Sequence, residues 1–188
     1  DTPRKRTFHL SLTRVSDPEF PMDVRFINPF VKSICNTFTT MCDLNVTVGK
    51  PQLVTDDACD ADISAIIGFS GDAAGSVIVK YNFDVACKIA SSFAKVEMDR
   101  NHPDLVDALG ELANMIAGGA KAQFEGLDVD ISLPSVVVGS HHHFPVARNA
   151  QRLILPCQTA IGTFETHVAM ILTKVEANTP AAASGASL

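Results

Sequence analysis

The chain has few basic residues and no long apolar run. It carries 15 Lys and Arg against 21 Asp and Glu, which gives a formal net charge of −6. Phosphate backbones are bound by clustered Lys and Arg, so this balance argues against a nucleic-acid partner. The sequence also lacks a run of about 18 apolar residues, and its N-terminus lacks the charged-then-apolar order of a signal peptide. We therefore expect no membrane-spanning helix and a cytoplasmic protein.

Paired cysteines and a convincing metal motif are missing as well. The five cysteines are scattered and form no C-x-x-C motif, which favours buried reduced thiols over a disulfide framework. The triplet His141–His143 suggests a metal site, because imidazoles are common ligands. Consecutive His side chains point in divergent directions, and no Cys, Asp or Glu stands at ligand spacing nearby. We expect a polar loop there and no metal; His167, inside the last apolar run, is expected to be a sheet or core residue.

A regular hydrophobic pattern begins only after residue 21. Residues 1–21 show no sustained period and are interpreted as an expression-vector leader or a disordered extension. Residues 177–188 are rich in Ala and Ser, which favours a flexible tail. Because 46% of the chain is hydrophobic, residues 22–176 are expected to form one domain with a sizeable core.

Residues 22–176 combine helical and strand patterns. Asn28 and Pro29 together indicate a helix start, because Asn caps free amides and Pro fits the first helical position. Helices and hairpins are interleaved without regular strand–helix–strand alternation, so we predict an α+β fold with a largely antiparallel sheet and helices packed on it. The expected elements are a strand at Val24–Ile27, a helix at Pro29–Cys42, strands in residues 44–54, a hairpin in residues 61–82 that turns at Ser70–Asp72, a helix from Phe83 to about Lys95, a helix from about Pro103 to Gly126, and strands in residues 129–140, 152–162 and 163–175, the last two joined near Gly162.

The helix expected over DALGELANMIAGGAKAQFEG, residues 107–126, contains residues that weaken a helix. Asn114 costs roughly half a kcal/mol relative to Ala, and Gly118 and Gly119 cost about 1 kcal/mol each. Helical spacing sorts its residues into two sides. The side expected to face the core holds Leu105, Ala108, Leu109, Leu112, Met115, Ile116 and Phe124, and the other side is a polar stripe of Asp104, Asp107, Glu111, Asn114, Gly118, Lys121 and Glu125.

Glu111 and Asn114 are three residues apart on this stripe, so their β-carbons lie about 5 to 6 Å from each other. Composition alone leaves two interpretations open. In the first, both are ordinary solvated side chains, and the glycines let another helix or strand approach closely. In the second, the pair acts on another molecule: the carboxylate pairs with a cation, and the amide, as donor and acceptor, orients a water.

The motif DALGELANMIAGGAK resembles the signature of the CheC/CheX/FliY phosphatases of bacterial chemotaxis, Asp-x-x-Gly-Glu-x-x-Asn-x-x-x-Gly. The matching residues are Asp107, Gly110, Glu111, Asn114 and Gly118. INPFVKSICNTFTTM is similar to the opening helix of CheX, and SLPSVVVG is similar to the segment after the signature helix. The first helix here has no Glu, so the signature occurs once, as in CheX-like proteins, which are homodimers. We do not expect the switch domain that FliY-like proteins carry, because these 188 residues leave no room for it.

The resemblance implies a CheC/CheX-like fold and hydrolysis of the aspartyl phosphate on a CheY-like response regulator. The regulator would supply the phosphorylated Asp, a Mg²⁺ ion and a Lys, so no cofactor is expected in this chain. Glu111 would pair with that Lys, and Asn114 would align the attacking water. The alternative is a non-catalytic module of the same fold that binds a regulator through the same stripe.

Four further residues of this helix have expected roles. Asp107 and Lys121 are solvated charges or rim contacts of the binding surface. For Gly118, clearing the helix surface for the regulator and close packing both stay open, whereas Gly119 is expected to let the helix sit close to the sheet.

Overall fold

The computed structural model describes residues 24–54, 61–140, 142, 144 and 150–173. The expected leader at residues 1–21 and the expected tail at residues 177–188 lie outside the described residues. The described residues form three helices and eight strands, in the order α1 (Val24–Cys42), β1 (Thr47–Val48), β2 (Gln52–Leu53), β3 (Ile63–Gly71), β4 (Ala73–Tyr81), α2 (Phe83–Ala94), α3 (Leu105–Lys121), β5 (Val129–Ile131), β6 (Ser135–Val138), β7 (Arg152–Thr159) and β8 (Gly162–Leu172).

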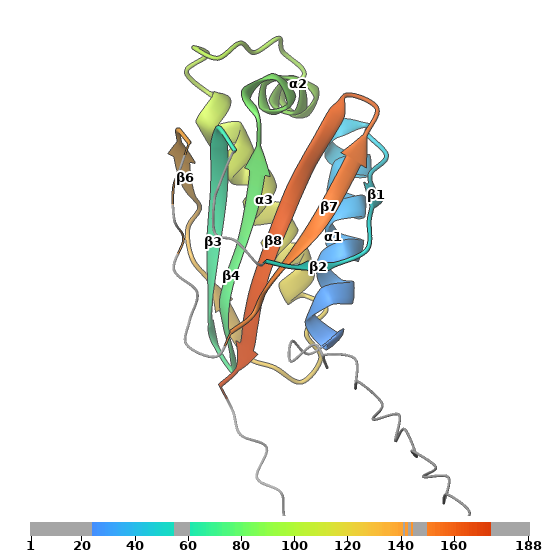
Figure 1. Ribbon diagram of the computed structural model, residues 1–188, viewed down its shortest axis with the longest axis vertical. Helices are drawn as coiled ribbons and strands as arrows, with labels where there is room; N and C mark the ends of the chain where they lie inside the picture. Colours follow the sequence, from blue (N-terminus) through green and yellow to red (C-terminus); the bar gives the residue numbers. More distant parts are fainter. Residues whose placement is uncertain (1–23, 55–60, 141, 143, 145–149, 174–188) are drawn as a thin grey trace, which may run out of the picture.

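The strands form one antiparallel sheet that is covered on one face by helices. The strand order is β1-β7-β8-β4-β3-β5, while β2 also pairs with β7 and β6 also pairs with β3. In Figure 1, α1 and α3 lie behind the sheet, and α2 lies across one end of it. The predicted α+β fold, a largely antiparallel sheet with packed helices, is confirmed.

Both predicted hairpins are present. β3 ends at Gly71 and β4 begins at Ala73, as the expected turn at Ser70–Asp72 requires, and Gly71 has a φ of 108° that favours glycine. β7 and β8 pair up to Thr159 opposite Gly162, so they are joined where the sequence predicts. Local turn residues therefore suffice to locate both hairpins.

The strands predicted in residues 44–54 are much shorter than expected. β1 and β2 have two residues each, and both pair with β7. Pro51 lies between them and has no N–H to donate, so one continuous ladder with β7 is not available there.

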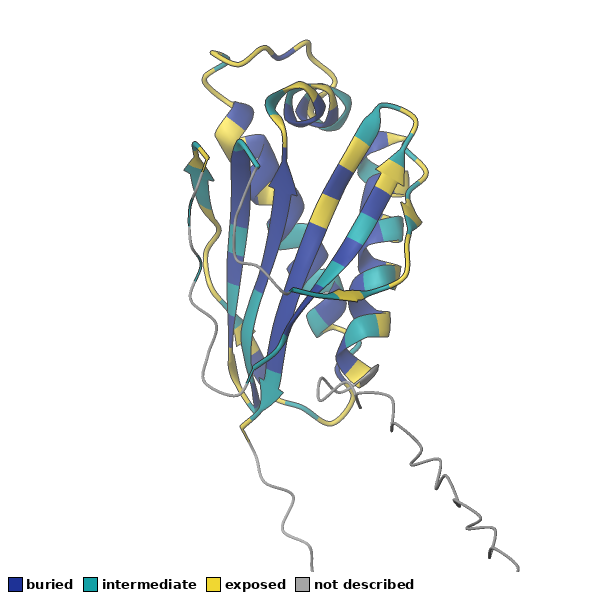
Figure 2. Ribbon diagram, viewed as in Figure 1, coloured by how far each residue is buried: buried dark blue, intermediate teal, exposed yellow. Residues whose placement is uncertain are grey.

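The core lies between the sheet and the helices α1 and α3. α1 contributes an apolar residue at every fourth position, and Phe26, Phe30, Ile34, Phe38 and Cys42 are all buried. Figure 2 shows that the central strands are buried over most of their length. Burial of each large side chain of this row contributes roughly 1.5 to 3 kcal/mol, so the row anchors α1 on the sheet.

The prediction of a strand at Val24–Ile27 is wrong, because these residues belong to α1. Pro29 lies inside the helix rather than at its first position, where it removes the N–H that would bond to the carbonyl of Arg25. The burial of Phe26 offsets this loss, and its ring packs edge-on against Phe124 with 5.2 Å between ring centroids. Tertiary packing thus overrides the local helix-start signal.

α3 begins at Leu105, close to the predicted start, but ends at Lys121 rather than at Gly126. The chain leaves the helix early because Phe124 turns into the core, where its ring centroid lies 6.1 Å from that of Phe69. Gly126, with a φ of 72°, then belongs to the turn that leads to β5. The glycine lies within the connection from α3 to β5 and does not mark the end of the helix.

The strand predicted in residues 129–140 is interrupted by a bulge. β5 and β6 both pair with β3, with Ile131 opposite Phe69 and Ser135 opposite Ile66. Three residues between the two pairs on the outer strand therefore face two residues on β3. An extra residue of this kind bends the strand and redirects a side chain.

Candidate functional site

The polar stripe of α3 lies on the side of the helix that faces away from the core. Glu111 is exposed, while Asn114 and Gly118 are half-buried. Neither the side chain of Glu111 nor that of Asn114 has a hydrogen bond or an ion pair with another described residue. The donors and the acceptor of the Asn114 amide are therefore available to another molecule. All residues predicted for the stripe are exposed or half-buried, but Glu125 lies beyond the end of α3, in the turn before β5: Asp104, Asp107, Glu111, Asn114, Gly118, Lys121 and Glu125.

One flank of the stripe is formed by the outer strand β5–β6. A β-carbon on Gly110 would lie 3.3 Å from Val136 Cγ2 and 3.5 Å from Pro134 Cβ, so the absence of a side chain lets the start of β6 approach α3. At the C-terminal end of α3, Lys121 Nζ lies 3.5 Å from Asp130 Oδ1. The outer strand therefore runs along α3 beside the stripe.

The two adjacent glycines of α3 have different surroundings. A β-carbon on Gly119 would lie 2.4 Å from Ser33 Oγ of α1, and this hydroxyl donates a hydrogen bond of 2.7 Å to the carbonyl of Ile116. The prediction that Gly119 serves close packing is confirmed, but its neighbour is α1 and not the sheet, because this side of α3 faces the other helix. A β-carbon on Gly118 would meet no atom within 4 Å, so packing does not explain Gly118.

Met115, which was predicted to face the core, is half-buried. It lies on the side of α3 toward α1 and lines a hollow of about 370 Å³ together with Met41 and Asn36. The core-facing side of α3 is therefore shifted toward the small residues Ala113 and Ala117, both fully buried.

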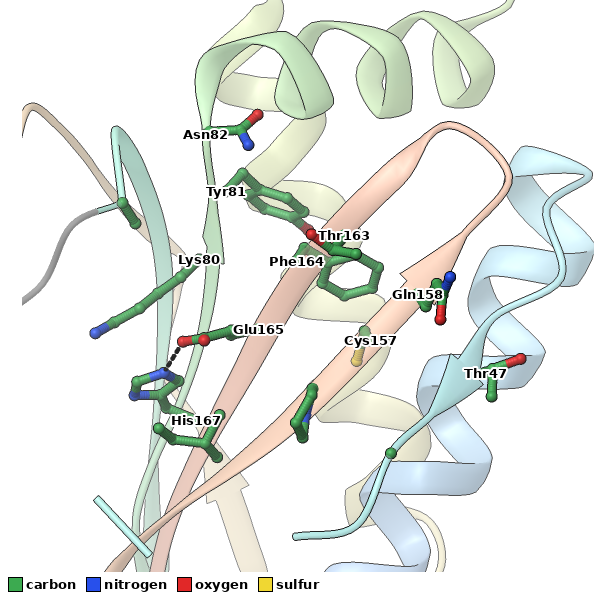
Figure 3. A pocket seen from close by; sticks show the side chains of 14 residues that line it. Thr47, Lys80, Tyr81, Asn82, Cys157, Gln158, Thr163, Phe164, Glu165 and His167 are labelled. Carbon is green, nitrogen blue, oxygen red and sulfur yellow. Dashed lines mark hydrogen bonds and ion pairs between the residues drawn. The ribbon is translucent and has the colours of Figure 1, made fainter. Parts of the chain in front are cut away.

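A larger hollow of about 620 Å³ lies on β4, β7 and β8 (Figure 3). Lys80 and Glu165 face each other across β4 and β8, and His167 lies two residues further along β8 on the same face. No residue of the α3 stripe lines this hollow. Small molecules bind in concave sites, whereas a protein-docking surface needs no cavity, so the hollow does not exclude the stripe as a docking site.

His167 is 5% exposed, which confirms that it is a buried residue of the sheet. Burial lowers the pKa of His167, although its hydrogen bond with Glu165, 2.7 Å from Nε2 to Oε2, raises it. The same bond holds the pKa of the Glu165 carboxyl below its ordinary value. At neutral pH the pair is a neutral imidazole donating to a carboxylate. Sequence reasoning missed Lys80 and Glu165, because the pattern of one strand does not show what lies opposite on the next.

The described cysteines are free thiols, and Cys59 lies outside the described residues. Burial raises the pKa of Cys42 to about 11 and that of Cys157 to about 12. Both thiols stay protonated at neutral pH and are poor nucleophiles, as structural cysteines are. The free thiols are Cys35, Cys42, Cys87 and Cys157.

Within the described ranges, His, Cys, Asp and Glu form no group of three or more that can hold a metal ion. Of the triplet His141–His143, only His142 is described. In the same part of the chain, no helix is long and apolar enough to cross a membrane.

Comparison with known proteins places the chain in a family. The sequence model of "Chemotaxis phosphatase CheX" matches residues 63–158, just over half of the chain. The chain belongs to the CheX family. A Thermotoga maritima protein named CheY-P phosphatase CheX is 32% identical over 122 residues, which cover 63% of this chain and 78% of that protein. The chain is accordingly a phosphatase, and the family predicted from the α3 motif is confirmed.

Solved structures share the fold. A CheC-like superfamily protein from Shewanella sp. PV-4 matches with a TM-score of 0.72 and 30% identity, over 80% of this chain and 99% of that one. CheX from Borrelia burgdorferi, solved in a complex with CheY, BeF₃ and Mg²⁺, matches with a TM-score of 0.64 and 23% identity, over 79% of this chain and 99% of that one. At this identity the second likeness concerns the fold alone.

Proposed function

We propose that the chain hydrolyses the aspartyl phosphate of a CheY-like response regulator, using the stripe of α3. The observation that carries the proposal is the pair Glu111 and Asn114, which lies on an accessible helix surface and has no partner among the described residues. Membership of the CheX family and the name of the T. maritima relative support the choice of substrate.

Asn114 is proposed to align the attacking water. Hydrolysis of an acyl phosphate depends on positioning and charge stabilisation more than on covalent chemistry from the protein. The water oxygen attacks phosphorus, the bond from phosphorus to the Asp oxygen breaks, and the Asp carboxylate leaves. The side-chain carbonyl of Asn114 accepts a hydrogen bond from this water and holds it in line with the breaking bond.

Glu111 is proposed to dock on the regulator. Its carboxylate is exposed one helical turn before Asn114, so a Lys beside the phosphoryl group of the regulator pairs with it while the amide reaches the water. Asp107 and Lys121 lie further along the stripe and contact the rim of the regulator. The Mg²⁺ ion that screens the phosphoryl oxygens is assigned to the regulator and not to this chain.

A matched set of variants tests these roles. Phosphate release from a phosphorylated CheY-like receiver with Mg²⁺ is measured for the wild type, Asn114→Ala and Glu111→Gln, and without added protein. Glu125→Gln is the control, because it removes an exposed charge that lies beyond the end of α3, in the turn before β5. We expect Glu111→Gln to raise the receiver concentration needed for half-maximal rate, and Glu125→Gln to behave as the wild type.

The second candidate is a non-catalytic module that binds a regulator through the same stripe. The exposed acidic residues Asp104, Asp107 and Glu111 favour it as a binding surface. It predicts a complex with the receiver that is weakened by Glu111→Lys, together with no acceleration of phosphate release by the wild type. Measuring binding and release on the same samples separates the two candidates.

A homodimer and a cytoplasmic location stay predictions. Sedimentation of the protein over a range of concentrations tests the dimer, since a concentration-independent monomer contradicts a CheX-like assembly.

A further inference from the structure

Leu133 is the most exposed large hydrophobic residue of the described chain. It is 86% exposed, whereas Val96, Val138 and Val106 are 50%, 49% and 37% exposed. Leu133 belongs to the bulge between β5 and β6, where the outer strand has one more residue than β3. Bulges at a sheet edge redirect side chains, and here the redirected residue is a leucine that faces water.

The bulge is held firmly on both sides of Leu133. Ser132 N donates to the carbonyl of Gly68 at 2.9 Å, and Gly68 N donates to Ser132 Oγ at 2.9 Å, so a side-chain hydroxyl replaces the missing strand carbonyl. On the other side, Pro134 packs against Gly110 of α3 and also restricts the backbone of the residue before it. Leu133 is therefore presented on an ordered backbone and not on a loose loop tip.

Two contacts bracket both Leu133 and Asn114. The outer strand touches α3 at Pro134 with Gly110 and at Asp130 with Lys121, so strand and helix run side by side in opposite directions. Asn114 lies between the two contacts on α3, and it is four residues, or about 6 Å, beyond Gly110. Leu133 lies between the two contacts on the strand, one residue or about 3.3 Å from Pro134.

Asn114 also lies on the side of α3 that faces this strand. Gly110 and Asn114 are four residues apart, so they share one side of the helix, and the β-carbon position of Gly110 is the one that points at Pro134 and Val136. Asn114 and Leu133 therefore both lie in the stretch where α3 and the outer strand run side by side.

We propose that Leu133 is an apolar docking contact for the CheY-like receiver. It contacts the receiver beside the phosphorylation site, while Asn114 reaches the phosphoryl group. The proposal rests on the proposed function and extends its surface from α3 onto the bulge. The receiver must then present an apolar patch next to the Lys that pairs with Glu111. Gly110 acquires a physical role, since it lets the bulge sit beside the catalytic amide.

The test separates binding from chemistry. Leu133→Ser is compared with Val96→Ser, which removes a half-exposed valine beyond the end of α2, and with Leu133→Met, which keeps an apolar side chain. Rates of phosphate release are measured over a range of receiver concentrations, and binding is measured to a receiver carrying BeF₃⁻ as a phosphoryl mimic. Thermal unfolding of each variant checks the fold.

We expect Leu133→Ser to raise KM and weaken binding by about 10- to 100-fold, the effect of losing one buried leucine contact, with kcat within about twofold of the wild type. Leu133→Met and Val96→Ser should stay within about threefold of the wild type. A KM for Leu133→Ser equal to that of the wild type would overturn the proposal, and so would a loss confined to kcat.

Failure of the proposed function gives a different result. If the wild type binds the BeF₃⁻ receiver without releasing phosphate from the phosphorylated one, hydrolysis is excluded and the binding measurements decide the role of Leu133. If the wild type neither binds nor hydrolyses, both proposals fall together.

Discussion

Gly119 of α3 and Ser33 of α1 meet so closely that a β-carbon on the glycine would lie 2.4 Å from Ser33 Oγ. The hydroxyl cannot move away freely, because it donates a buried hydrogen bond of 2.7 Å to the carbonyl of Ile116. This contact sets the position of α3 against α1, and thereby the position of the residues on its outer side.

Gly119→Ala should destabilise the protein by about 1 to 3 kcal/mol, the usual cost of an extra methyl group in a packed contact. The higher helix propensity of Ala offsets part of this cost. Urea unfolding followed by circular dichroism measures the change. Unchanged or increased stability would show that the two helices separate easily at this point.

Gly118→Ala should have the opposite effect on stability. No atom lies within 4 Å of the added β-carbon, so Ala should gain about 0.5 to 1 kcal/mol through helix propensity. If Gly118 clears the surface for a receiver, the same variant binds the receiver more weakly. A variant that is more stable and equally active would remove Gly118 from the binding surface.

His167 should make the protein less stable as the pH falls below about 6.5. Burial lowers its pKa in the folded state, so the unfolded chain takes up a proton that the folded chain resists. The limiting slope is about 1.4 kcal/mol per pH unit for one proton. Glu165 also has a lowered pKa, but its contribution is lost only below its ordinary value of 4.5. The interval from pH 7 to 5 therefore isolates the histidine.

Unfolding of the wild type and His167→Gln at pH 7, 6 and 5 measures this effect. The wild type should lose more stability than the variant over that interval. Equal losses in the two proteins would mean that His167 titrates alike in the folded and unfolded states.

Features with local signals could be predicted from the sequence. The β3–β4 turn, the start of α3 and the polar stripe all follow from residue types at short spacing. The role of Pro29 was predicted wrongly, because the packing of Phe26 on Phe124, from a distant segment, decides the start of α1. Long-range contacts override a local signal when they bury large side chains.

The sequence alone identifies only part of the candidate site. Glu111 and Asn114 could be found from helical spacing and from a family resemblance. Leu133 could not, because its exposure depends on the register of β5 and β6 on β3. The packing partner of Gly119 was missed for the same reason, since no pattern within α3 identifies α1 as its neighbour.

The most direct measurement is the rate of phosphate release from a phosphorylated CheY-like receiver at saturating concentrations of the wild type and of Asn114→Ala. Removing one preorganised hydrogen-bonding group from such a site typically slows the reaction by about 10²- to 10³-fold. We predict a loss of that size, with receiver binding retained and stability equal or slightly raised, since Ala is the better helix former. A rate within a few-fold of the wild type, in a variant that still folds and binds, would show that Asn114 does not align the attacking water.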